Sequence, residues 1–160
     1  MEKIFLLLGT NVGELKKNLM SAIEELSKNG IKILKKSPIY RTKPWGKIDK
    51  PDFLNMAIEV ETDLTPDELL QTIKNIEKNL KREKTEKWGP RTIDIDILFY
   101  GDRIINKPDL VIPHPYFFER PFALIPMQDI APDFIPPAYK KSIKELISGA
   151  SYEGIEIYCD

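Results

Sequence analysis

Apolar and polar positions along this chain change repeatedly between the two-residue period of strands and the 3.6-residue period of helices. Residues 4–8 are an unbroken apolar run, which predicts a buried strand that ends at Gly9. Helical spacing follows and predicts a helix that Gly30 ends and that Thr10 or Asn11 caps. The apolar positions of this helix are Leu15, Leu19, Ala22, Ile23 and Leu26.

Strands and a long loop are predicted next. Residues 31–36 alternate apolar and basic side chains, which indicates a half-buried strand that can continue to Tyr40. Residues 41–51 are rich in proline and glycine and poor in apolar side chains, so we expect a loop long enough to act as a lid. Residues 53–61 alternate most clearly and predict a strand. One face carries Leu54, Met56, Ile58 and Val60, and the other carries Phe53, Asn55, Ala57, Glu59 and Glu61.

The sequence of its first turn predicts a second helix. Thr65 is followed by Pro66 and, three residues on, by Glu68, which together form a capping box with proline at the first helical position. The helical pattern runs to about Leu80, and residues 81–90 form a charged loop. The chain therefore returns to the sheet only after this loop.

The remaining third of the chain begins with a strand. Apolar alternation from residue 93 predicts a strand that can reach Tyr100, and after a turn residues 103–105 can pair back as a short strand. Eight prolines then fall within residues 108–137. That density predicts an irregular segment with short helical pieces, one of them over residues 144–147.

The order strand, helix, strand, strand, helix, strand indicates an α+β fold. We expect two helices on one face of a mostly antiparallel sheet, a second face free to form a ligand cleft, and a Pro-rich C-terminal segment. Because no repeat or linker divides the sequence, residues 1–160 are interpreted as one domain.

Composition narrows the function classes. The chain is 42% hydrophobic and 31% charged, as in soluble globular proteins, and its formal net charge of −1 argues against a general nucleic-acid binder. A single cysteine, Cys159, excludes a disulfide framework and favours a reducing compartment. The apolar run at residues 4–8 is too short for a signal-peptide core or a membrane span. We therefore expect a cytoplasmic protein without a membrane or nucleic-acid partner.

Two carboxylates stand at i and i+2 in the fourth predicted strand. Asp94 and Asp96 point to the same face, roughly 7 Å apart at Cα. Such a pair suits Mg²⁺, which takes one or two protein carboxylates and completes its shell with water and phosphate. A solvated edge strand with balancing lysines is the plainer alternative. The preceding Trp88, Gly89, Pro90 and Arg91 favour a phosphate site instead.

Basic side chains gather just before these aspartates. Residues 74–91 hold seven lysines and arginines against three glutamates, a local surplus in a chain of net charge −1. Basic groups beside a dicarboxylate are what a magnesium polyphosphate requires. For the individual lysines a solvated helix end is the preferred explanation, whereas Arg82 and Arg91 are interpreted as phosphate ligands.

Glu77 is anomalous because it falls on the helical arc that should be apolar. A carboxylate buried there must be paired, since burying it alone is costly. A structural ion pair with lysine or arginine is one explanation. A ligand contact at the edge of the cleft is the other, and it is favoured.

Two further groups can contact a ligand. Phe53 and Asn55 share a strand face and can stack on and hydrogen-bond a flat heterocycle, although cross-strand packing beneath a loop explains them equally well. His114 is the single histidine and is held between Pro113 and Pro115. Single histidines are more often structural, but with Arg120 close by, His114 is interpreted as a phosphate donor.

Taken together, these segments resemble the 6-hydroxymethyl-7,8-dihydropterin pyrophosphokinases, enzymes of folate biosynthesis. The matching segments are residues 9–11, 40–42, 44–46, 53–55, 88–96 and 113–122. They span nearly the whole chain, and the stretch 88–96 is highly specific for the family.

The resemblance implies a ferredoxin-like fold and transfer of the terminal pyrophosphate of ATP to the pterin hydroxymethyl group, with release of AMP. It implies a monomer, two Mg²⁺ ions and two loops, 43–52 and 81–90, that close over the substrates. The implied catalytic residues are Arg82, Arg91, Asp94 and Asp96, of which Asp94 and Asp96 hold the metal. The implied ATP ligands are Glu77, Arg82, Lys84, Trp88, Arg91, Ile97, His114 and Arg120. The implied pterin ligands are Thr42, Lys43, Pro44, Trp45, Phe53, Asn55, Asp94 and Phe122.

Departures from the family pattern affect loop contacts rather than the reaction. Phe53 stands where tyrosine is frequent, and Lys81 replaces a common glycine. Lys84 can match either of two basic positions because the loop is one residue short against some relatives. Two other functions stay open at this point. A single-stranded RNA module would stack bases on the exposed aromatics, and a pterin or nucleotide sensor would have kept the pocket and lost turnover.

Overall fold

The computed structural model describes residues 2–11, 14–42, 52–83, 93–115, 117–147 and 155–159, and of residues 81–83 and 159 it describes the backbone only. The strands are β1 (Ile4–Thr10), β2 (Lys32–Lys36), β3 (Ile39–Thr42), β4 (Phe53–Glu61), β5 (Asp94–Tyr100), β6 (Ile105–Lys107), β7 (Leu110–Ile112) and β8 (Ile155–Cys159). The helices are α1 (Leu15–Lys28), α2 (Pro66–Glu83), the 3₁₀ turn η1 (Phe117–Glu119), α3 (Pro121–Ile130) and α4 (Ile143–Ile147).

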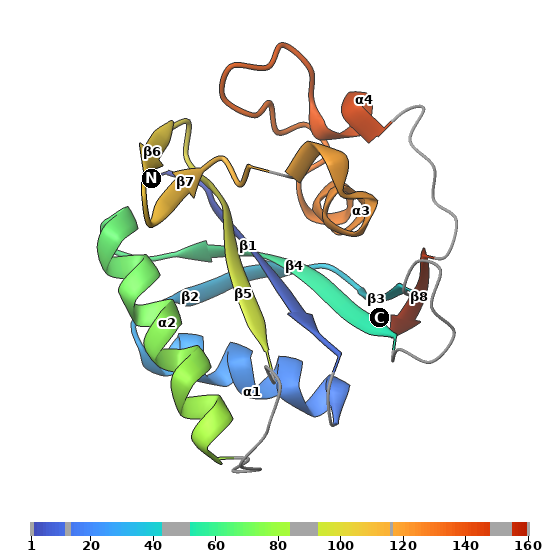
Figure 1. The fold of residues 1–160 in the computed structure, drawn as a ribbon. Coiled ribbons are helices and arrows are strands. Elements are labelled where there is room, and N and C mark those ends of the chain that lie inside the picture. Colours follow the sequence, from blue (N-terminus) through green and yellow to red (C-terminus); the bar gives the residue numbers. More distant parts are fainter. Residues whose placement is uncertain are drawn as a thin grey trace.

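The main sheet is antiparallel throughout. Its strand order is β5-β1-β4-β3-β8, and β2 also pairs with β4, beyond the point where β3 leaves it (Figure 1). The α+β class and the mostly antiparallel sheet are therefore confirmed. β1 and β4, the two apolar strands, lie at the centre, which is where continuous burial is expected.

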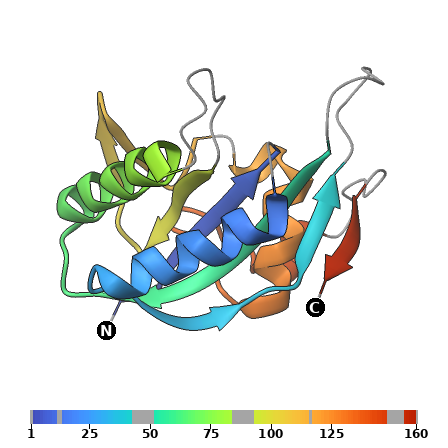
Figure 2. The ribbon, with the colours of Figure 1, turned by 90° about the horizontal axis from the view of Figure 1, so that it is seen from below.

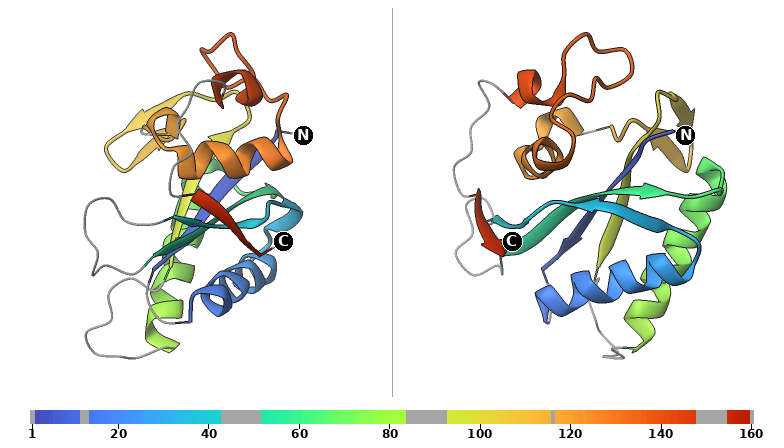
Figure 3. Two further views of the ribbon diagram at one scale, coloured as in Figure 1. Left: turned by 90° about the vertical axis from the view of Figure 1, so that its right-hand side faces the viewer. Right: turned by 180° about the vertical axis from the view of Figure 1, so that it is seen from behind.

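Helices α1 and α2 cover one face of this sheet, as expected (Figures 2 and 3). Their apolar stripes pack against the even-numbered side chains of β1 and β4, and this first core is completed by Ile95 and Ile97 of β5. Leu19 and Leu69 illustrate the burial, since neither side chain is exposed. Each fully buried side chain of this size contributes about 1.5–3 kcal/mol.

The opposite face is only partly free, which corrects the expectation of an open second face. Helix α3 and the segment up to α4 lie against it (Figures 1 and 3). Phenylalanine rings pack this segment against the sheet. The centre of the Phe134 ring lies 5.0 Å from the ring centres of both Phe5 and Phe99, and the centre of the Phe117 ring lies 4.9 Å from that of Phe99. Among the described residues, this second core does not include Asp94, Asp96 or Asn55, which lie at the end of the face where β5 begins.

Several predicted elements are confirmed. The strand over residues 53–61 has the expected bounds, and the strand before Tyr100 begins at Asp94. The capping box is made as the sequence indicates, because the Thr65 N–H donates to Glu68 (2.9 Å) and the Glu68 N–H donates to Thr65 (3.2 Å). The helical piece over residues 144–147 is also present, as α4.

The predicted cap of the first helix is wrong. Helix α1 begins at Leu15, and its N-cap is Glu14, which makes no side-chain capping bond. Thr10 belongs to β1 instead, and its hydroxyl accepts a hydrogen bond from the buried Asn18 amide (3.0 Å). The packing of α1 on β1 thus uses the Thr10 hydroxyl, which the local sequence had indicated as a helix cap.

The C-terminal third is more regular than the prolines suggest. Helix α3 extends over ten residues because Pro121 occupies the first turn, where no N–H is needed, and the helix continues through Pro126. The pairing expected for residues 103–105 is wrong, since β6 pairs with β7 rather than with β5. Strand β8, which pairs with β3, was not predicted. In the described ranges, no helix has both the length and the hydropathy to cross a membrane.

Replacement of Thr65 by alanine tests the capping box. We expect Thr65→Ala to lower the free energy of unfolding by about 1 kcal/mol, because the Glu68 N–H loses its acceptor. Urea unfolding measures this, and Thr72→Ala, a substitution inside the same helix, is the control. Thr72→Ala should be neutral or stabilising, since alanine has the higher helix propensity. Equal losses in both variants would contradict a capping role.

Candidate active site

A row of paired residues crosses the sheet at the end where β5 begins. Gly9 of β1 is opposite both Asp94 of β5 and Asn55 of β4, and Asn55 is opposite Tyr40 of β3. Side chains that are directly opposite in a sheet point to the same face. The Tyr40 hydroxyl donates to Asp129 of α3, so this face is the one that α3 partly covers. We call Asp94, Gly9, Asn55 and Tyr40 the site row.

Gly9 leaves room for the Asn55 amide in the middle of the site row. A Cβ atom at this position would lie 2.7 Å from the Asn55 amide oxygen, a separation that real Cβ atoms do not show. The Asn55 amide therefore lies over the backbone of β1. Two strand spacings separate Asp94 from Asn55, about 10 Å at Cα. The Gly9 backbone between them has no side chain of its own, and we call it the bare floor.

Asp94 and Asp96 share one face of β5, as the alternation predicts. Asp96 is opposite Leu7, two positions along from the pairing of Asp94 with Gly9. Both aspartates are partly buried, and the Asp96 side chain keeps 39% of its exposure. The carboxylates thus stand at the open end of the second face, beside the bare floor.

An irregularity in β5 brings His114 to the aspartates. The register with β1 passes from Ile97 directly to Phe99, which leaves Leu98 without a partner in β1. The Leu98 carbonyl accepts a hydrogen bond from the His114 N–H (3.1 Å). His114 Nε2 lies 3.9 Å from an Asp96 carboxylate oxygen. At the bulge, the backbone of His114 is therefore bonded to Leu98, two residues beyond Asp96.

The His114 imidazole is neutral near pH 7. Burial lowers the pKa of His114 below its ordinary value, Arg120 lowers it further, and the Asp96 carboxylate opposes both effects without reversing them. The contact with Asp96 is accordingly no ion pair at that pH. A neutral imidazole still offers one N–H as a donor.

Consecutive turns connect His114 to the start of α3. The Phe117 N–H donates to the His114 carbonyl (3.2 Å), and the Arg120 N–H donates to the Phe117 carbonyl (3.1 Å). Arg120 is the N-cap residue of α3, and its guanidinium lies 5.5 Å from the centre of the Phe122 ring. His114, Arg120 and Phe122 thus form one short, backbone-bonded segment beside the open end of the sheet.

Glu77 reaches β5 from helix α2. Its carboxylate accepts a hydrogen bond from the Ile95 N–H at 2.8 Å. One structural partner is therefore the backbone of the strand that carries the aspartates, a possibility that sequence reasoning had not considered.

Phe53 and Thr42 lie opposite each other at the ends of β4 and β3. Phe53 is two residues from Asn55 on the same face and is 37% exposed. The Thr42 hydroxyl is buried, and within the described part of the chain it has no hydrogen-bond partner.

Ile97 differs from the other predicted ligands, because its side chain lies in the first core, on the far side of the sheet. Any contact that Ile97 makes with a ligand beside the aspartates must therefore come from its backbone.

Several predicted ligands lie outside the described residues. These are Lys43, Pro44, Trp45, Lys84, Trp88 and Arg91, together with the side chain of Arg82. Their assignment stays a prediction.

The donor set fits magnesium better than a transition metal. In the part of the chain that the structure describes, no three His, Cys, Asp or Glu side chains converge as a metal cluster. Two neighbouring carboxylates are sufficient for Mg²⁺, which draws its remaining ligands from water and phosphate. Asp94 and Asp96 supply that pair.

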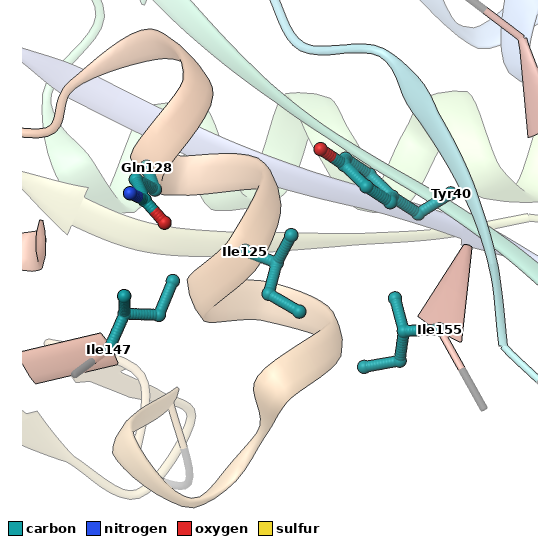
Figure 4. A pocket seen from close by; sticks show the side chains of 5 residues that line it. All are labelled: Tyr40, Ile125, Gln128, Ile147 and Ile155. Atoms are coloured by element: carbon teal, nitrogen blue, oxygen red, sulfur yellow. The ribbon is translucent and has the colours of Figure 1, made fainter. Parts of the chain in front are cut away.

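A cavity of about 400 Å³ adjoins the Tyr40 end of the site row, between α3 and the β3–β8 edge. Tyr40, Ile125, Gln128, Ile147 and Ile155 line it, mostly with apolar atoms (Figure 4). None of the predicted ligands is among them. The predicted ligands therefore lie at the end of the sheet where β5 begins rather than in this cavity.

Sequence reasoning missed two contributors to the site. Gly9 was interpreted as the end of a strand and as part of the family-matching segment 9–11, without a role in the site, and Leu98 only as part of an apolar strand. Both act through the register of β1 with its neighbours. The sequence signal for Gly9 would have been a glycine opposite an asparagine, and that signal can be read only when the strand pairing is known.

Comparison with known proteins agrees with this geometry. The family model for 7,8-dihydro-6-hydroxymethylpterin-pyrophosphokinase (HPPK) matches residues 5–132, which include every described residue of the site. The chain belongs to the HPPK family. Asp94, Asn55 and His114 are thus residues of an HPPK domain, and the predicted family is confirmed.

Curated relatives support this assignment over most of the chain. A 2-amino-4-hydroxy-6-hydroxymethyldihydropteridine pyrophosphokinase of Synechocystis is 44% identical over 88% of this chain and 72% of its own length. The protein of the same name from Aquifex aeolicus is 42% identical and covers 91% and 90% of the two chains. The folic acid synthesis protein fol1 of Pneumocystis carinii is 45% identical, and this chain covers 19% of it.

Solved structures share the fold at low sequence identity. A Plasmodium falciparum HPPK-DHPS structure superposes with a TM-score of 0.75 at 20% identity, over 92% of this chain and 45% of that one. An HPPK-DHPS complex with substrates gives 0.72 at 16% identity, over 92% and 43%. The chain spans less than half the length of these solved proteins, so the likeness concerns their HPPK-like part.

Proposed function

We propose that the site row and the neighbouring Asp96 form the active site at which this pyrophosphokinase transfers the terminal diphosphate of ATP to 6-hydroxymethyl-7,8-dihydropterin. The activity itself follows from the family: the chain is a pyrophosphokinase of folate biosynthesis. One observation supports the location above all. The register places a carboxylate pair and a buried amide on either side of bare backbone at the open end of the sheet.

The pterin is assigned to the Asn55 end of the bare floor. The Asn55 amide can donate and accept along the ring edge, and the buried Thr42 hydroxyl offers a second hydrogen bond. Phe53 and Phe122 provide apolar faces for stacking. Lys43, Pro44 and Trp45 complete the proposed pterin ligands.

The ATP phosphates are assigned to the Asp94 end. Asp94 and Asp96 would hold two Mg²⁺ ions, which neutralise phosphate charge and orient the transferred group when bound. His114 and Arg120 face the same end and can donate to phosphate oxygens. Arg82, Lys84, Trp88 and Arg91 are proposed as further ATP ligands, with Glu77 and the Ile97 backbone at the edge of the site.

The reaction asks mainly for positioning and charge neutralisation. The hydroxymethyl oxygen attacks the β-phosphorus, the new oxygen–phosphorus bond forms as the bond between the β-phosphorus and the AMP oxygen breaks, and the hydroxyl proton passes to solvent. Asn55 fixes the direction of the hydroxymethyl group by holding the ring. Cationic donors such as Arg120 balance the charge that develops on the leaving phosphate.

We further infer that the core is ferredoxin-like. The element order β1-α1-(β2, β3)-β4-α2-β5 and the strand order β5-β1-β4-(β2, β3) support this, with the two helices on one face. Residues 1–160 are proposed to act as one pyrophosphokinase domain, in which the Pro-rich segment serves as cover for the second face.

The nucleotide product tests the reaction. We expect the protein, with Mg-ATP and 6-hydroxymethyl-7,8-dihydropterin, to form AMP and the pterin diphosphate in equal amounts, as measured by chromatography. ADP would indicate an ordinary kinase. No nucleotide product, with pterin or ATP still bound, would support a sensor and contradict catalysis.

Substitution of Asp96 tests the carboxylate pair. We expect Asp96→Ala to lower kcat at least about 10³-fold, since a metal-bound carboxylate accounts for several kcal/mol of transition-state stabilisation. The melting temperature should change little, because Asp96 is partly exposed. Asp102→Ala, in the exposed turn after the same strand, is the matched control and should keep full turnover. Near-normal turnover of Asp96→Ala would refute the assignment.

Gly9→Ala tests the bare floor. The added methyl group must displace the Asn55 amide. We expect KM for the pterin to rise about tenfold, the effect of one lost hydrogen bond to a ligand, while KM for ATP stays within about twofold. In an Asn55→Ala background the same change should add nothing. Additive losses in this double-mutant cycle would show that Gly9 does not act through Asn55.

A further inference from the structure

Glu77 occupies an unusual position for a carboxylate. It is partly buried on α2, and its helical neighbours Ile73, Ile76 and Leu80 are buried in the first core. An acidic side chain on such a face lowers stability unless it has a strong partner. The contact of Glu77 with β5 therefore needs an explanation, and the two aspartates on that strand offer one.

The contact is made at the outer edge of the sheet. β5 is the last strand in the sheet order and pairs with β1 alone in the described part of the chain. Along an antiparallel strand, N–H groups point alternately to its two sides. The Ile95 N–H points away from β1, because it donates to the Glu77 carboxylate at 2.8 Å. Glu77 thus takes the place that a neighbouring strand would occupy.

The position along β5 is equally specific. Ile95 stands between Asp94 and Asp96, and Asp94 is the first residue of the strand. Strand ends at a sheet edge open easily, and two like charges on one face favour such opening. A hydrogen bond from the intervening peptide to an ionised acceptor is stronger than one to a neutral acceptor. It holds the Asp94–Ile95 peptide plane, which carries Asp94 directly and lies one peptide before Asp96.

We propose that Glu77 is a positioning residue, whose carboxylate fixes the open edge of β5 so that Asp94 and Asp96 keep a common direction. This rests on the proposed function only where it concerns magnesium and turnover. Glu77 acts through the Ile95 peptide, and that contact requires an oxygen acceptor but no net charge. A glutamine at this position can therefore maintain the contact, whereas an alanine cannot.

Amide hydrogen exchange tests the contact in the ligand-free protein. We expect exchange of the Ile95 N–H, followed by NMR, to be about tenfold or more faster in Glu77→Ala than in the wild type. Exchange in Glu77→Gln should stay within about threefold of the wild type. Glu24→Ala, a substitution of an exposed glutamate on α1, is the control and should leave Ile95 exchange unchanged. Unchanged exchange in Glu77→Ala would overturn the proposal.

Magnesium dependence tests the consequence for the aspartates. The Mg²⁺ concentration for half-maximal turnover should rise about tenfold in Glu77→Ala and should stay near the wild-type value in Glu77→Gln. KM for the pterin should stay within about twofold in both variants. If Glu77→Gln is as impaired as Glu77→Ala, the charge itself is needed and a positioning role is refuted.

The two proposals fail in different ways. A wild-type protein that forms no AMP would refute the proposed function, yet the exchange of Ile95 would still decide whether Glu77 holds the strand. If Glu77→Ala does not fold, Glu77→Gln still gives a result. A folded Glu77→Gln protein with fast Ile95 exchange would overturn the positioning role.

Discussion

The register of β1 with its two neighbours is the constraint on which the site depends. Gly9 is opposite Asp94 on one side and Asn55 on the other. A shift of one residue in either pairing would turn the whole strand over, so that an aspartate or an asparagine would face the α1–α2 core. The apolar faces of β1 and β4 prevent such a shift, because their even-numbered side chains fill that core. Burial on one face of the sheet therefore sets the chemistry on the other.

The second face of the sheet combines a packed half with an open half. Phe5, Phe99 and Phe134 seal the packed half under the C-terminal segment. The same segment carries Arg120 and Phe122 at the start of α3, at the boundary between the two halves. The Pro-rich part of the chain is thus both a cover for the core and a wall of the site. An uncovered sheet, as the element order suggested, would lack that wall.

β5 lies at the edge of the sheet, where structure is easily lost, and three contacts compensate for this. Pairing with β1 holds one side of the strand, and the bulge at Leu98 lets the His114 N–H bond to its backbone. Glu77 bonds to Ile95 from helix α2 on the outer side. The strand that carries the two aspartates is therefore tied to parts of the chain that lie before and after it in the sequence. Such ties limit how far repulsion between the carboxylates can turn them apart.

Local patterns in the sequence determined most of the elements, the alternation that puts Asp94 and Asp96 on one face, the capping box at Thr65, and the family. They could not determine that the Thr10 hydroxyl bonds to Asn18 instead of capping α1, that β8 pairs with β3, or where β6 pairs, because each depends on contacts between distant segments. Glu77 shows the difference most clearly. Its helical position revealed that a carboxylate required a partner, but only the folding of α2 against the edge of β5 decided that the partner is a peptide N–H, since hydrogen bonds across the sheet edge leave no periodic signal in the sequence.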